Sequence, residues 1–277
     1  RTGLDTPYMG PEFLGLVKKI VEKAKKDGMH VYLYDEDRWP SGFGGGMVTR
    51  EDAYRGRYLV FTPFCQETRT STEKDRITGS SAAGKVQGNG RLLARYEISL
   101  KDGYLSEYRR LADGEEGTNI WYAYLELSPK SPWFNNESYV NTLDKKATKR
   151  FIEVTHEKYL QTVGEEFGGV IPSIFTDEPQ FTHKQTLGKA EEKKDVLIPY
   201  TDDFEDTFCK TYGESFLDHL PEVFWELPDG QISLTRYHYH DHLAERFAEA
   251  YADTLGSWCE SHRIALTGHM MAEPTLG

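Results

Sequence analysis

The stretch that decides the fold reads MHVYLYDEDRWPSGFGGG and spans residues 29–46. It begins as a short apolar run, which is typical of a buried strand, and ends as a glycine-rich loop. Between them lie Asp35, Glu36 and Asp37, followed by Trp39 and a Pro-Ser-Gly turn. A strand that ends directly in carboxylates and a tryptophan indicates that its carboxyl end has a chemical role.

Two later apolar runs end in a similar way. SIFTDEP ends in Asp177, Glu178 and a proline, and ALTGHMMAEP carries His269 and then Glu273, again before a proline. Parallel strands that are buried on both faces read as such continuous runs. In a (β/α)8 barrel, functional side chains gather at the carboxyl ends of different strands. We therefore expect the three segments to be parallel strands whose polar ends converge on one mouth.

Helical patterns separate these strands. Apolar residues share one face of 11–27, and Gly28 is well placed to end that helix. Apolar residues spaced by about one helical turn recur in 144–167 and in 233–260. Alternation of helices with short apolar strands favours an α/β fold.

Residues 57–127 have a different character. Strand-like runs flank a polar, glycine-rich loop, which predicts an antiparallel β insertion. Residues 182–202 are charged and irregular, so we interpret them as a surface loop, and a short helix is expected at 202–213.

The expected architecture is therefore an α/β fold of the (β/α)8 TIM-barrel type with an antiparallel β insertion. We assign 1–56 to the first part of the barrel, 57–128 to the insertion and 129–277 to the continuation of the barrel. Only about four barrel strands can be recognised where a closed barrel needs eight. We expect an incomplete barrel, with the chain a fragment of a longer protein and its exposed edges open to association.

Composition narrows the function classes. The 277 residues carry a net charge of −12, which disfavours a polyanionic partner such as nucleic acid. No apolar run approaches the length of a membrane span. The 3 cysteines are dispersed and form no CxxC motif, so neither a disulfide framework nor a zinc site is indicated. The aromatic content of 13% suits a sugar-binding surface as well as an ordinary core.

Glu178 and Glu273 form the candidate catalytic pair. Glycoside hydrolysis needs one carboxyl group to protonate the leaving oxygen and a second that acts as base or nucleophile. The distance between the two decides between retention and inversion, and the sequence does not supply it. Taken alone, the motif around Glu178 is explained more simply by solvated acids that cap a strand. The proline after Glu178 predicts an extended backbone at that residue.

The acids at the strand ends also have other interpretations. Some could accept hydrogen bonds from sugar hydroxyls while Trp39 stacks on a sugar ring, and a rigid loop packed on the barrel rim would explain Trp39 equally well. Oxygen ligands suit a hard metal such as calcium, although the spacing is not that of an EF-hand. The acids concerned are Asp35, Glu36, Asp37 and Asp177, together with His269.

Two tempting motifs are rejected. The glycine run at 42–46 lacks the lysine and hydroxyl residues that end a phosphate-binding loop, and it has no GxGxxG register. His238, His240 and His242 are spaced by two on an expected helix and lack an HExxH pattern. We interpret these histidines as packing or solvated side chains.

Three motifs together resemble glycoside hydrolase family 106, the α-L-rhamnosidases and their relatives. They read GLDTPYMGPEF…AKKDGMHVYLYDEDRWPSGFGGG, FTDEPQF and LTGHMMAEP, in that order. The segment YDEDRWPSG is the specific part, and the resemblance covers roughly 1–60 and 129–277.

The resemblance implies a (β/α)8 barrel in a large multidomain enzyme that cleaves plant or microbial polysaccharide with inversion. It implies that Glu178 is the general acid and Glu273 the general base. The other candidates would belong to the substrate pocket (Asp35, Asp37 and Trp39) or to its floor (Asp177 and His269). A bound calcium ion is implied without assigned ligands, as are a periplasmic or extracellular bacterial location and accessory β-domains beyond this chain.

Two alternatives stay open on the sequence. The chain could be a non-catalytic carbohydrate-binding fragment in which Trp39 and tyrosines stack on sugars. It could also be a metal-dependent hydrolase of another class, with Asp35, Asp177 and His269 as ligands. No organic cofactor is expected.

Overall fold

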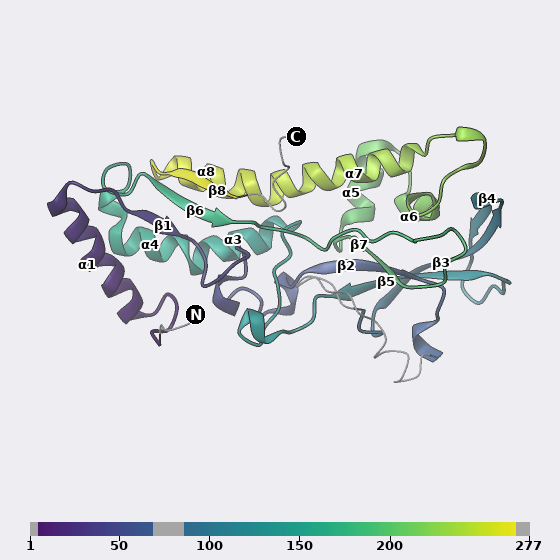
Figure 1. Cartoon of the computed structure of the whole chain (residues 1–277), viewed down its shortest axis with the longest axis horizontal. Coiled ribbons are helices and arrows are strands. Elements are labelled where there is room, and N and C mark those ends of the chain that lie inside the picture. Colours follow the sequence, from purple (N-terminus) through teal and green to yellow (C-terminus); the bar gives the residue numbers. More distant parts are fainter. Residues whose placement is uncertain (1–4, 69–85, 270–277) are drawn as a thin grey trace. The chain divides into compact units, whose positions relative to one another are not determined.

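The computed structural model describes residues 5–68 and 86–269, which divide into two compact units (Figure 1). The parallel-sheet unit consists of 5–55, 130–181 and 247–269. The antiparallel-sheet unit consists of 56–68, 86–129 and 182–246. Each unit is therefore assembled from segments that are distant in the sequence.

The first unit is built on a parallel sheet of order β1-β6-β8. Its strands are β1 (Tyr32–Tyr34), β6 (Ser173–Asp177) and β8 (Ala265–His269). Tyr34 pairs with Phe175, and Asp177 pairs with His269, so the carboxyl ends of the strands lie at one edge. The prediction of three parallel strands with a shared polar edge is confirmed for the described residues.

Helices α1 (Pro11–Asp27), α3 (Lys145–Val154), α4 (His156–Val163) and α8 (Asp253–Ser261) belong to the same unit. The N–H of Gly28, which adopts φ 69°, closes α1 on the carbonyl oxygens of its last turn, as the sequence predicted. Val21 of α1 and Tyr159 of α4 pack with Leu33 and Ile174 of the sheet in one apolar core. Burial of these side chains holds the strand ends in place.

The second unit contains an antiparallel sheet of order β4-β3-β5-β2-β7. Its strands are β2 (Arg57–Thr62), β3 (Arg91–Lys101), β4 (Tyr104–Arg110), β5 (Ile120–Leu127) and β7 (Val196–Pro199). The predicted antiparallel β region is confirmed. The interpretation of 182–202 as a surface loop is wrong in part, because its apolar run forms β7, which is buried and pairs with β2.

Helices α5 (Phe204–Tyr212), α6 (Phe216–His219) and α7 (Leu234–Phe247) complete the second unit, whose core is rich in aromatic side chains. Phe61 of β2, for example, stacks on Phe224 with ring centroids 4.6 Å apart. The helix predicted over 233–260 is confirmed, with a π-helical turn, η8 (Ala248–Ala252), between α7 and α8.

Short 3-10 turns connect these elements. They are η1 (Gly44–Gly46), η2 (Asp52–Tyr54), η3 (Gln66–Thr68), η4 (Pro132–Phe134), η5 (Gly164–Glu166), η6 (Leu220–Val223) and η7 (Pro228–Gly230). Among the described residues, no helix combines the length and the apolar character that a membrane crossing requires.

The chain thus has a mixed α/β fold with one parallel and one antiparallel sheet. A (β/α)8 barrel stays a prediction, because the parallel sheet of the described residues has three strands where about four were expected. The assignment of 1–56, 57–128 and 129–277 to barrel and insertion also stays a prediction. Within the structure, Thr182–Arg246 belongs to the unit that holds the antiparallel sheet.

The strands β8 and β6 approach each other closely at Gly268. A methyl group on Gly268 would lie 1.9 Å from the carbonyl oxygen of its partner Thr176. We predict that Gly268→Ala lowers the free energy of unfolding by about 2 kcal/mol or more, measured by urea denaturation. Gly256→Ala in α8 is the matched control, since nothing lies within 4 Å of its added methyl, and it should be neutral or stabilising. Equal stability of the two variants would contradict this pairing.

Candidate functional site

The carboxyl ends of β6 and β8 bring three of the candidate residues together. Tyr34 donates its hydroxyl to Oδ2 of Asp177 at 2.9 Å, and Oδ1 of Asp177 lies 3.7 Å from Nδ1 of His269. The N–H of Glu178 donates to the carbonyl oxygen of His269 at 3.0 Å. Asp177, Glu178 and His269 are therefore neighbours, as the parallel arrangement predicted.

Trp39 joins this cluster from the loop that follows β1. Its Nε1 donates to Oε2 of Glu178 at 2.6 Å, and 39% of the residue is exposed. The Trp39-Pro40 peptide bond is cis. Ser41 ties the loop to the end of β6, because its N–H donates to the Asp177 carbonyl oxygen and its Oγ accepts from the Asp177 N–H, both at 2.8 Å. The indole is thereby fixed beside the carboxylate.

The backbone of Glu178 lies in the left-handed region, with φ 43°. The prediction of an extended Glu178 is therefore wrong. A bulky residue at positive φ costs free energy that the surroundings must offset. Here the backbone bond to His269 and the side-chain bond from Trp39 both hold the residue in place. Backbone strain of this kind is concentrated at functional sites.

Asp35 is fully buried beneath the loop. Its Oδ1 accepts a hydrogen bond from the hydroxyl of Ser41 at 2.6 Å. Burial raises the pKa of Asp35 to about 7, although hydrogen bonds from the Ser41 and Thr176 hydroxyls oppose the shift. Asp35 thus supports Ser41, which in turn holds the backbone of Asp177.

Glu36 is wrapped by the glycine-rich loop. Its two carboxylate oxygens accept backbone N–H bonds at 2.6–3.0 Å from Asp37, Gly42, Gly44 and Gly45. Burial raises the pKa of Glu36 to about 8 against the opposing effect of these N–H groups. Sequence reasoning rejected a phosphate loop here and missed that the glycine N–H groups bind a carboxyl group of the chain itself. A glutamate followed closely by GFGGG was the available signal.

The surroundings of Glu36 do not fit a calcium ligand, because N–H donors point at both of its oxygens. Among residues 5–68 and 86–269, no group of three or more His, Cys, Asp or Glu side chains is arranged to hold a metal ion. This finding includes the ligand set Asp35, Asp177 and His269 that the sequence left open. Calcium binding stays a prediction, and no calcium ligands are assigned among the described residues.

The side chain of Asp37 is buried and organises the outer part of the loop. Its Oδ2 accepts from Nδ2 of Asn135 at 3.0 Å and lies 3.5 Å from Nε of Arg38. Nη2 of Arg38 donates in turn to Oδ1 of Asn135 at 3.1 Å. Asp37 therefore positions its neighbours, and Asn135 also donates to the carbonyl oxygen of Gly45 at 3.0 Å.

Trp133, at the turn η4, is a neighbour of the site that sequence reasoning missed. Its ring centroid lies 6.3 Å from that of Trp39 at an interplanar angle of 77°. Its Nε1 donates to the carbonyl oxygen of Trp39 at 2.8 Å, and 46% of the residue is exposed. The turn SPWF carries no strand-end pattern, so its sequence gave little indication of this position.

Glu273, the second carboxylate of the predicted pair, lies outside the described residues, and its distance from Glu178 stays untested. The interpretation of the histidines in α7 as packing residues is confirmed for two of them. His242 is buried against Phe204 and Phe208, and His238 stacks on Tyr212.

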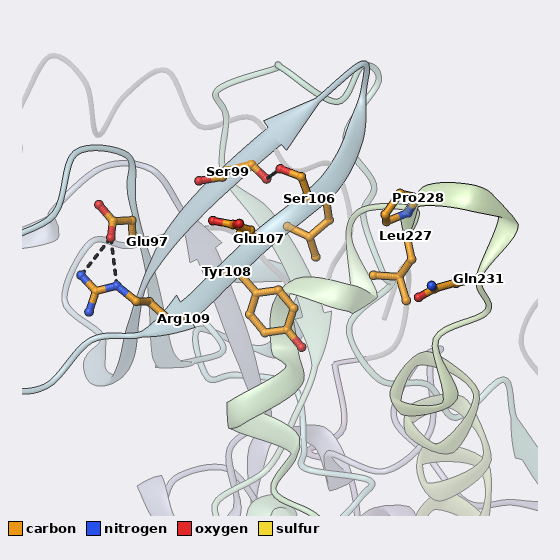
Figure 2. A pocket seen from close by; sticks show the side chains of 10 residues that line it. Glu97, Ser99, Ser106, Glu107, Tyr108, Arg109, Leu227, Pro228 and Gln231 are labelled. Carbon is orange, nitrogen blue, oxygen red and sulfur yellow. Dashed lines mark hydrogen bonds and ion pairs between the residues drawn. The ribbon is translucent and has the colours of Figure 1, made fainter.

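A hollow of about 620 Å³ lies on the antiparallel-sheet unit, and none of the predicted site residues is among those that line it (Figure 2). Figure 2 shows the Glu97 and Arg109 side chains paired with each other on its wall. The hydroxyl of Tyr108 donates to Glu222. The side chains of Glu97, Arg109 and Tyr108, which line the hollow, therefore have partners within the protein. The strand-end cluster is the stronger candidate site.

The chain was compared with protein families, curated proteins and solved structures. No protein family model matches the chain, and no curated protein matches it either. A solved rhamnosidase from Novosphingobium sp. PP1Y is similar at 11% sequence identity and a TM-score of 0.49. The likeness covers 98% of this chain and 42% of that chain, so this chain spans less than half the length of the rhamnosidase.

The buried Asp35 predicts a specific pH dependence. Its raised pKa means that the folded protein holds a proton that the unfolded chain has lost between about pH 4 and pH 7. Asp35 therefore makes the free energy of unfolding fall as the pH rises through this window, and the loss is complete above it. We predict that Asp35→Asn removes this fall, which amounts to about 1.4 kcal/mol per pH unit at its steepest. Urea denaturation from pH 4 to pH 8 measures it, and parallel curves for the two proteins would contradict the prediction.

Proposed function

We propose that this protein is a glycoside hydrolase in which Glu178 is the general acid. The hydrogen bond between Trp39 Nε1 and Glu178 Oε2, at 2.6 Å, carries the proposal. It places a carboxyl group beside a partly exposed indole at the carboxyl end of a parallel strand. An indole face binds the apolar face of a sugar ring, and the adjacent carboxyl group can then protonate the glycosidic oxygen.

The neighbouring polar groups suit the recognition of sugar hydroxyls. Asp177 accepts from Tyr34 on one oxygen and lies near the His269 ring on the other. That ring meets the Phe175 ring at 81°, with centroids 5.0 Å apart. The orientation of the half-exposed His269 is therefore set from two sides, which allows its free ring edge to bond a substrate hydroxyl.

The reaction that we propose is hydrolysis with inversion. Glu178 would give its proton to the leaving oxygen while a second carboxylate removes a proton from the attacking water. We assign the second role to Glu273, following the motif resemblance. The same resemblance makes α-L-rhamnosides of plant or microbial polysaccharides the first substrates to test. Asp35 and Asp37 would act from beneath, by holding Ser41 and Arg38.

A second candidate function is sugar binding without catalysis. The exposure of both Trp39 and Trp133 favours it, since large apolar side chains at a surface often mark a binding site. In that case Glu178→Gln would leave sugar affinity intact, and no product would form with either protein.

Replacement of the general acid should affect substrates unequally. We predict that Glu178→Gln lowers kcat about 1000-fold for alkyl rhamnosides, because these leaving groups need a proton. Dinitrophenyl rhamnoside should lose less than about tenfold, because its leaving group departs as the anion. Steady-state kinetics of released sugar measure both.

Glu153→Gln is the matched control, because Glu153 is an exposed glutamate in α3 of the same unit. It should leave both rates unchanged. Full activity of Glu178→Gln on alkyl rhamnosides, or equal losses on the two substrates, would contradict the role of Glu178 as general acid.

A further inference from the structure

Trp39 and Trp133 form an aromatic corner at the candidate site. Their rings meet nearly at right angles, at 77°, with centroids 6.3 Å apart. Both side chains are more than one third exposed. Large apolar side chains are normally buried, so a pair of exposed neighbouring indoles indicates a surface that another molecule covers.

The exposure does not arise from unsatisfied polar groups. Nε1 of Trp39 donates to Glu178 at 2.6 Å, and Nε1 of Trp133 donates to the carbonyl oxygen of Trp39 at 2.8 Å. The indoles therefore do not need water for their N–H groups. What remains accessible is apolar ring surface, which is the surface that stacks on the C–H face of a pyranose.

The corner is held in a fixed shape before any ligand binds. The guanidinium of Arg38 lies over the Trp133 ring, 5.9 Å from its centroid, and donates to Asn135. Asn135 donates to the carbonyl oxygen of Gly45, whose own N–H donates to Glu36. A surface fixed in this way loses little conformational entropy on binding.

Charge at the site disfavours an anionic sugar. Glu178 lies at the corner, and Asp177 precedes it in the chain. The carboxylate of a uronic acid would meet repulsion from these acids, and the guanidinium of the nearby Arg38 is already paired with Asp37. An uncharged sugar avoids this cost.

We propose that the aromatic corner binds an uncharged pyranose ring next to the bond that is cleaved, and that Trp133 contacts this ring directly. The proposal rests on the proposed function for the position of the cleaved bond. It adds a substrate-binding residue that the motifs did not contain and a preference for uncharged sugars at this position.

The experiment measures binding to the Glu178→Gln protein, in which turnover does not interfere. Isothermal titration with a rhamnosyl-glucose disaccharide gives its Kd, and the matching rhamnosyl-glucuronate tests the charge preference. We expect the uncharged disaccharide to bind about tenfold more tightly than the charged one. Adding Trp133→Ala should weaken binding of the uncharged disaccharide about tenfold.

Two further variants separate stacking from support of Trp39. Trp133→Phe keeps an aromatic face but loses the N–H bond to Trp39, so it should stay within about threefold of the Glu178→Gln protein. Tyr104→Ala removes an exposed aromatic side chain from β4 of the other unit and should leave the Kd unchanged. Near-ultraviolet circular dichroism confirms that each variant is folded.

Three results would overturn the proposal: an unchanged Kd in Trp133→Ala, an equal loss in Trp133→Phe and Trp133→Ala, or tighter binding of the glucuronate. Absence of binding by either disaccharide would do the same. Failure of the proposed function gives a different result. The unsubstituted protein would then release no sugar from any glycoside, while the titration would still report binding.

Discussion

The candidate site depends on the hydrogen bonds that the buried carboxyl group of Glu36 accepts from the loop backbone. A loop cannot close around its own backbone without partners for its N–H groups, and the Glu36 oxygens supply partners for the N–H groups of Asp37 and three glycines. Glycine is required here for steric reasons as well. A methyl group on Gly42 would lie 2.6 Å from Val140, and one on Gly44 would lie 2.9 Å from Val154. Because Glu36 occupies the N–H groups of the loop, they are not available to a phosphate ligand, and they hold the loop in the conformation described.

A short series of contacts links this loop to the exposed residues of the candidate site. Asp35 holds the Ser41 hydroxyl, and Ser41 holds the end of β6. On the outer side, Asp37 binds Asn135 and pairs with Arg38, whose guanidinium lies over the Trp133 ring. Buried acids therefore orient the exposed groups, and the site shows a division between supporting carboxylates beneath and Glu178, with its indole partner, above.

Local patterns were sufficient to predict α1, the three parallel strands and the edge at which their polar ends meet. Periodicity, the glycine after α1 and the apolar runs are properties of neighbouring residues. Other features depend on contacts that are distant in the sequence. β7 is a strand because it pairs with β2, and Glu178 has positive φ because His269 and Trp39 hold it. Trp133 reaches the site only through the fold, so its own turn could not reveal it.

The central claim is that Glu178 faces a second carboxylate, that of Glu273, across a bound sugar. The most direct measurement is an experimental structure of the protein with rhamnose bound and the separation of the two carboxyl groups read from it. The account predicts the sugar beside Trp39, flanked by both groups at roughly 6.5 to 9.5 Å from each other, as inversion requires. A sugar bound elsewhere, or a Glu273 carboxyl group directed away from it, would contradict the account.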